Sequence, residues 1–150
     1  MSLTGCHARS LDDKLRVAIP KPIRDQLGSD VTHLVIAPGL NGSLDVFPPA
    51  EFHRLSQLIS EKSLDVRKFE RMLFGRSEKV ELDSQGRIRI PERLAALAGL
   101  SRDVVLLGVR NHVELWDADR WRKFEEENAA EFDALALKAL SRNEEAKPNG

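Results

Sequence analysis

The chain contains the same segment twice. Residues 12–20 (DDKLRVAIP) recur as residues 83–91 (DSQGRIRIP), so an Asp, an Arg, an aliphatic residue, an Ile and a Pro reappear in order 71 positions later. Gly28 recurs as Gly99 at the same offset, and residues 44–47 (LDVF) correspond to residues 113–116 (VELW) at an offset of 69. An ordered series of matches over about forty residues indicates two copies of one structural unit.

Both copies predict the same order of secondary structure. Polar and apolar residues alternate after each Asp-x-x-x-Arg segment, which predicts a short strand following a turn. A proline ends this strand, because proline cannot donate to a strand ladder, and a short helix then ends at Gly28 or Gly99. Two further strands are predicted in each copy, over residues 33–37 and 43–47 and over residues 104–109 and 112–116. The unit is therefore β-β-α-β-β, used twice.

The size of this unit determines the expected architecture. About 45 residues bury too little apolar surface to be stable alone, so we expect an α+β fold in which the two units interlock as a pseudo-dimeric, β-barrel-like core. Apolar residues at helical spacing predict two helices within residues 51–75 and one long helix from Asp119. The expected organisation is a first unit (6–53), a helical linker (54–76), a second unit (77–120), and a C-terminal helix with a polar tail (121–150) that frays from residue 141.

Charge is distributed unevenly along a chain whose net charge is −1. Bases outnumber acids in residues 1–28 and 84–93, whereas acids outnumber bases in residues 117–146. The sequence has no apolar run long enough to span a membrane, its start lacks the apolar segment of a secretory signal, and it contains one cysteine. We therefore expect a cytoplasmic protein.

The duplicated Asp-x-x-x-Arg-aliphatic-x-Ile-Pro motif, followed each time by a short helix ending in Gly, resembles the MraZ family. Members of this family carry two SpoVT–AbrB-type swapped-hairpin units, and residues 74–76 (FGR) leading into residues 81–83 (ELD) are similar to the family's linker. The resemblance covers roughly residues 5–125. It implies a bacterial transcriptional regulator on the nucleoid, commonly of an operon for cell division and cell-wall synthesis. It also implies binding to G-rich direct repeats in double-stranded DNA and a ring-shaped homo-oligomer.

The arginines with which the family contacts DNA match Arg16 and Arg87. A two-stranded ribbon fits the major groove of B-DNA, and an arginine can donate two hydrogen bonds to guanine O6 and N7. Other bases are expected to contact phosphates, which position a protein without reading sequence, with ordinary surface charge as the alternative for each. These candidates are Lys14, Lys21, Arg24, Arg89 and Arg93.

Asp12 and Asp83 lie four residues before these arginines, across the turn. Each is expected to support the turn, either by accepting hydrogen bonds from its backbone or by holding the arginine. Gly86 is expected to supply a positive φ, but the first copy has Leu15 at this position. Leucine in the left-handed region costs about 1–2 kcal/mol, so either the first turn carries this strain or its backbone follows another path.

Little in the sequence supports an enzyme. The histidines at positions 7, 33, 53 and 112 lack metal-binding spacing, and phosphate-binding loops and nucleophile motifs are absent. We therefore expect no catalytic residue, cofactor or metal site. Two alternatives to a DNA-binding regulator remain. The first is a protein-interaction module that has lost DNA binding, which would be consistent with Leu15 and the acidic segment 117–146. The second is an AbrB-type antitoxin, but such proteins usually carry one unit per chain, so the duplication argues against it.

Overall fold

The computed structural model describes residues 2–59 and 63–145, so the last five residues of the expected polar tail lie outside the described part. The chain divides into two compact units, one ending at Ala118 and one beginning at Asp119. Within the described residues, no helix is both long enough and apolar enough to cross a membrane.

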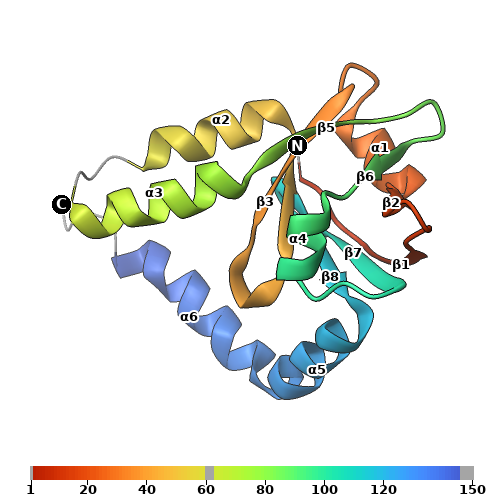
Figure 1. Cartoon of the computed structure of the whole chain (residues 1–150). Helices are drawn as coiled ribbons and strands as arrows, with labels where there is room; N and C mark the ends of the chain where they lie inside the picture. Colours follow the sequence, from red (N-terminus) through yellow and green to blue (C-terminus); the bar gives the residue numbers. More distant parts are fainter. Residues whose placement is uncertain (1, 60–62, 146–150) are drawn as a thin grey trace. The chain divides into compact units, whose positions relative to one another are not determined.

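The first compact unit has the predicted order of elements, which is therefore confirmed (Figure 1). The first copy consists of β1 (Cys6–Ser10), β2 (Arg16–Ala18), α1 (Lys21–Leu27), β3 (His33–Pro38) and β4 (Leu44–Phe47). The second consists of β5 (Glu78–Glu81), β6 (Arg87–Arg89), α4 (Glu92–Leu97), β7 (Asp103–Val109) and β8 (His112–Asp117). Between them lie α2 (Pro49–Leu58) and α3 (Leu64–Arg76), and a short 3-10 helix (Leu40–Gly42) joins β3 to β4.

Strand pairing joins the two copies. Six strands form one sheet in the order β1-β7-β8-β4-β3-β5, and β2 and β6 form a separate two-stranded ribbon. The first strand of each copy pairs with the third strand of the other copy, as β1 does with β7 and β5 with β3. The two second strands pair with each other, and so do the two fourth strands. All these pairs are antiparallel, and they relate the copies by a pseudo-two-fold axis.

The expected barrel-like closure does not form among the described strands. The six-stranded sheet is open, with β1 and β5 at its edges. The ribbon strands hold three residues each and pair only with one another, so they do not connect the two sheet edges.

One apolar core connects the ribbon to the sheet. Val17 and Ile88, which are opposite each other in the ribbon, are almost completely buried together with Val46 and Leu115 of the sheet. Each of these pairs holds equivalent positions of the two copies, so both copies contribute to the same core. Burying one side chain of this size stabilises the fold by about 1.5–3 kcal/mol.

The helix α4 ends as the sequence predicts. Gly99 has φ 60°, its N–H donates to the carbonyl of Ala96, and the N–H of Leu100 donates to the carbonyl of Ala95. This pair of bonds satisfies the last carbonyls of the helix and turns the chain toward β7.

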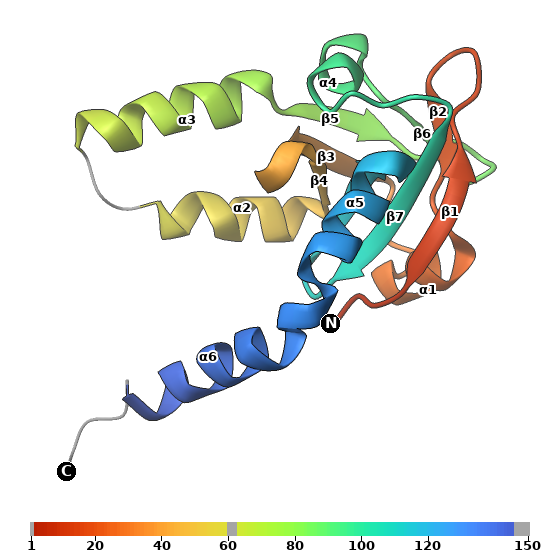
Figure 2. The ribbon, with the colours of Figure 1, turned by 90° about the horizontal axis from the view of Figure 1, so that it is seen from below.

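Helices α2 and α3 run side by side in both views and lie against the other face of the sheet (Figures 1 and 2). Phe47 and Ala37 of the sheet are buried against Leu73 of α3, and Phe52 of α2 packs beside them. The rings of Phe52 and Phe74 meet at a centroid distance of 5.6 Å, which joins the two helices.

The second compact unit corrects one expectation. Instead of one long helix, α5 (Ala118–Asn128) and α6 (Phe132–Glu145) are separated by a 3-10 turn (Ala129–Glu131). The interruption follows Asn128, whose side-chain amide donates to the carbonyl of Phe124 at 2.7 Å. A side chain that bonds the preceding turn of a helix competes with continuation of the backbone ladder.

Candidate nucleic-acid interface

Two equivalent turns lead into the ribbon strands. Asp12 Oδ1 accepts hydrogen bonds from the backbone N–H groups of Lys14 (2.9 Å) and Arg16 (2.8 Å), and its Oδ2 accepts from Arg16 Nε at 2.7 Å. Asp83 makes the same three bonds, with Gln85 N–H (2.8 Å), Arg87 N–H (2.9 Å) and Arg87 Nε (2.8 Å). Each aspartate thus caps the turn backbone and holds the arginine at once.

These bonds keep both aspartates ionised. The hydrogen bond from the backbone N–H of Arg16 lowers the pKa of Asp12, and the Arg16 guanidinium adds to this effect. The backbone N–H and the guanidinium of Arg87 lower the pKa of Asp83 in the same way. Among the described residues, the terminal nitrogens of Arg16 and Arg87 make no hydrogen bond. Each guanidinium is therefore fixed through Nε while its outer edge is available for a two-pronged contact.

The first turn carries the strain that its sequence implies. Leu15 has φ 60° and Gly86 has φ 75°, so the two turns follow the same path. The carbonyl of Leu15 accepts from Ile90 N–H at 2.8 Å, and the carbonyl of Gly86 accepts from Ile19 N–H at 2.9 Å. The side chain of Leu15 is partly buried against the main core.

Different residues surround the two turns. A Cβ atom at Gly86 would lie 2.7 Å from Nη1 of Arg24 in α1, whose Nε donates to the carbonyl of Ile19 at 3.0 Å. The position equivalent to Arg24 in the second copy is Ala95. At the second turn, Gly86 therefore lies beside the large side chain of Arg24. For the first turn, which has Leu15, the residue equivalent to Arg24 is the small Ala95. Arg24 lies beside the second turn, a placement that was not predicted from the sequence.

The outer face of the ribbon is basic. Arg16 is opposite Arg89, and Arg87 is opposite Ala18. Because these residues alternate with buried Val17 and Ile88, all four share the face turned away from the core. Like charges directly opposite each other are unfavourable in a strand pair, which makes this face suited to a polyanion.

The other expected phosphate contacts have different surroundings. Lys14 is exposed in the first turn, and no ion pair of its side chain occurs in the described part of the chain. Lys21 Nζ lies 3.1 Å from Asp25 Oδ2, and Arg93 Nη2 lies 3.7 Å from Glu78 Oε2. The charges of Lys21 and Arg93 are thus partly compensated within the protein.

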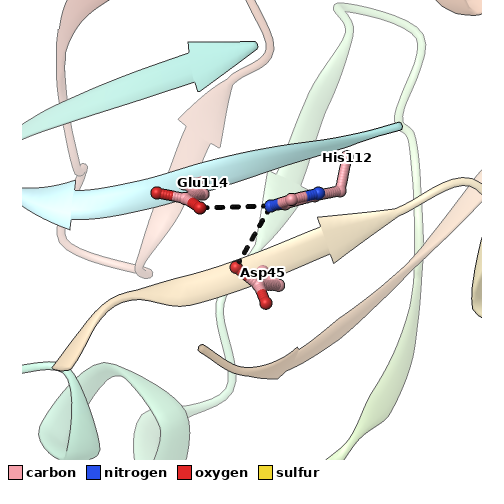
Figure 3. A group of neighbouring side chains, drawn as sticks. All are labelled: Asp45, His112 and Glu114. Atoms are coloured by element: carbon pink, nitrogen blue, oxygen red, sulfur yellow. Dashed lines mark hydrogen bonds and ion pairs between the residues drawn. The ribbon is translucent and has the colours of Figure 1, made fainter. Parts of the chain in front are cut away.

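A second polar cluster lies on the sheet face that carries Phe47. His112 Nε2 is 3.1 Å from Glu114 Oε2 and 3.6 Å from Asp45 Oδ1, and Figure 3 shows both carboxylates directed toward this nitrogen. Burial raises the pKa of Asp45 to about 6. Burial alone would lower the pKa of His112, but its hydrogen bond to Glu114 and the two negative charges raise it. This cluster was not predicted from the sequence, although Asp45 and Glu114 are equivalent positions of the duplication.

Comparison with known proteins agrees with the duplication. A family model described as "MraZ protein, putative antitoxin-like" matches residues 3–74 and again residues 73–143. The chain is 39% identical over 137 residues to the transcriptional regulator MraZ of Limosilactobacillus reuteri, covering 89% of this chain and 94% of the relative. It is 42% identical over 136 residues to the protein of the same name from Pediococcus pentosaceus, covering 88% and 92%. For the one from Thermobifida fusca, the identity is 37% over 139 residues, covering 91% and 95%. Two matches to one family model, together with relatives of this similarity along most of the chain, show that the chain belongs to the MraZ family.

Proposed function

We propose that this chain is a DNA-binding transcriptional regulator that reads base sequence through Arg16 and Arg87. The observation that carries the proposal is the paired geometry of these arginines. Each is anchored through Nε to an ionised aspartate, and the outer edge of its guanidinium is available for guanine O6 and N7. The relatives named transcriptional regulators support the same function rather than an enzymatic one.

The basic face of the ribbon supplies the non-specific part of binding. Arg89 lies on the same outer face, and Lys14 and Arg24 lie at or beside the turns, so these three are the first candidates for phosphate contacts. Lys21 and Arg93 would have to exchange Asp25 and Glu78 for a phosphate oxygen, so their contribution is smaller.

The proposal includes the target and the assembly. Residues 6–53 and 77–120 act as two DNA-binding units of the swapped-hairpin type, joined by 54–76 and followed by 121–150. They read short G-rich direct repeats in the promoter of a cell-division and cell-wall operon, on the nucleoid of the cytoplasm. Several chains form a ring, in which many weak contacts along spaced repeats add up to a stable complex.

The test measures binding of the full chain to a duplex of G-rich direct repeats and to a scrambled duplex of the same composition, at several salt concentrations. Arg16→Ala/Arg87→Ala should lose about 1–3 kcal/mol per engaged site on the repeats and should no longer distinguish the two duplexes. The matched control is Arg67→Ala/Arg71→Ala, which removes the same charge from exposed positions of α3. This control should keep the preference for the repeats.

Other outcomes separate the alternatives. Equal weakening on both duplexes, with a salt slope reduced by about 1 per contact, would mean that the arginines contact phosphate only. A folded wild-type chain that binds neither duplex would contradict the proposal and favour the protein-interaction module.

A further inference from the structure

Strand pairing places two carboxylates together at a half-buried position. Asp45 and Glu114 are direct partners in the β4–β8 ladder, and their side chains are 21% and 24% exposed. Like charges directly opposite each other destabilise an antiparallel pair, and partial burial increases this cost. The pair therefore needs a positive partner.

The described residues provide this partner only through His112. No lysine or arginine of the described chain forms an ion pair with Asp45 or Glu114, and Arg110, whose charge acts on His112, is paired with neither. Helix α2 contributes Glu51 and Arg54 to a pocket that Asn111 also lines, and these two side chains pair with each other at 3.1 Å. The two carboxylates thus share one imidazole nitrogen.

Hydrogen bonds around the cluster orient the groups as metal ligands. His112 Nδ1 lies 2.8 Å from the side-chain oxygen of Asn111, which can only accept, so Nδ1 carries a proton and Nε2 presents a lone pair when the ring is neutral. Glu114 Oε1 accepts from Trp116 Nε1 at 3.0 Å, which fixes the carboxylate and leaves Oε2 toward the imidazole. A metal-binding histidine commonly donates its second ring N–H to an oxygen in this way.

The distances between the three ligand atoms are close to those around a tetrahedral ion. Ligand atoms about 2.0–2.2 Å from Zn²⁺ are separated from one another by roughly 3.3–3.6 Å. His112 Nε2 lies 3.1 Å and 3.6 Å from the two carboxylate oxygens, and all three ligand atoms lie within 4.8 Å of one another. From this geometry we propose that Asp45, His112 and Glu114 bind one divalent transition-metal ion of the Zn²⁺ type, with water completing its coordination.

The site lies where the two copies meet. Asp45 belongs to β4 of the first copy, whereas His112 and Glu114 belong to β8 of the second. A bound ion would therefore join the copies across their pseudo-two-fold axis. The position equivalent to His112 in the first copy is Ser43, so the duplication produces one site per chain and not two. The spacing of histidines along the chain, from which no metal site was predicted, does not show ligands that strand pairing brings together.

The experiment titrates ZnCl₂ into the full-length chain after removal of metal with a chelator, with calorimetric detection. We expect one Zn²⁺ per chain and at least tenfold weaker binding by His112→Gln and by Asp45→Asn. His53→Gln removes an exposed histidine of α2, and Cys6→Ala removes the strongest alternative zinc ligand. Both controls should bind as the wild type does.

A second readout does not depend on the variants being folded. In the wild type, saturating Zn²⁺ should shift the NMR signals of the His112 ring and raise the melting temperature, while the ring of His53 is unaffected. The proposal would be overturned if the wild type showed no saturable binding, if folded His112→Gln bound Zn²⁺ normally, or if Cys6→Ala abolished binding.

Discussion

Leu15 has a backbone conformation that glycine occupies in the other copy. Its φ of 60° is unfavourable for a residue with a side chain, yet the side chain packs against the main core. Replacement of Leu15 by glycine relieves the backbone strain but also removes the packing of the side chain. The loss of packing offsets the gain in stability expected from the relief of strain. A comparison of two substitutions separates these effects.

We expect Leu15→Ala to destabilise the fold more than Leu15→Gly, by about 1 kcal/mol, because alanine keeps the strain while both substitutions lose the packing. If residue 15 had a negative φ, the glycine variant would instead be the less stable of the two, because glycine in regular structure destabilises a fold by about 0.5–1 kcal/mol relative to alanine. Urea unfolding of the two variants measures the difference. An alanine variant more stable than the glycine variant would contradict a positive φ at residue 15.

Asp12 and Asp83 make the turns sensitive to acid. Because their pKa values in the folded chain lie below 3.8, the stabilisation that they provide is present above the unfolded pKa and is lost as pH falls through the folded pKa. NMR titration of the carboxyl groups should show both pKa values below 3.8. In Arg16→Ala the pKa of Asp12 should rise only in part, because the backbone N–H of residue 16 still donates to it, while Asp83 serves as the internal reference. A pKa of Asp12 at or above its ordinary value in the wild type would contradict the described turn.

At the scale of elements, the ribbon formed by β2 and β6 has one face buried in the core and one face that is basic and turned outward. Ile88 faces the core and is 1% exposed, whereas Arg89 stands on the outer face. Ile88→Ala should therefore lower the free energy of unfolding by about 2–5 kcal/mol. Arg89→Ala should change it by no more than about 0.5 kcal/mol.

Chemical unfolding checks stability, and DNA binding of the folded variants checks the outer face. Arg89→Ala should weaken binding to every duplex similarly while the fold is retained. A large loss of stability in Arg89→Ala would show that the outer face also supports the core.

Elements with local signals could be predicted from the sequence. The alternation around Val17, the glycine after α4 and the Asp-x-x-x-Arg turns are each encoded within a few residues, and the structure has all of them. The open sheet was not predictable, because the sequence does not show that three-residue strands pair only with each other. The Asp45–His112–Glu114 cluster was missed because it depends on the register between β4 and β8. These strands are adjacent in the sheet, although 64 residues lie between Phe47 and His112 in the sequence. The break after Asn128 was missed because apolar spacing continues across it.

At the scale of the whole molecule, each copy depends on the other for strand partners. In a fragment of residues 1–76, β1 would lack β7, β3 would lack β5, and β4 would lack β8. We expect this fragment to be unfolded, or to dimerise so that a second fragment supplies the missing strands. Circular dichroism and light scattering distinguish these states from a folded monomer. A monomeric fragment with cooperative unfolding would contradict the dependence of the copies on each other.

The proposed ring requires surfaces for other chains. Exposed apolar residues occur on α2 and α3 (Leu58, Leu64, Phe69 and Met72) and separately on α6 (Phe132, Leu137 and Leu140), and such residues are typical of interaction surfaces. A ring needs head-to-tail contacts between two different surfaces. Light scattering should therefore give a mass several times 16.9 kDa, and Leu137→Glu/Leu140→Glu should reduce it. A monomer at all micromolar concentrations would rule out the ring.

The fusion of two copies in one polypeptide has a consequence for evolution. In a symmetric dimer of identical chains, one mutation changes both turns, so the two turns must stay alike. In this chain the two turns have already diverged. Gly86 lies beside Arg24 at one turn, whereas the other turn has Leu15, and Ala95 occupies the position equivalent to Arg24. Because Arg16 and Arg87 are encoded by separate codons, selection can change the side chains of one turn while those of the other stay unchanged.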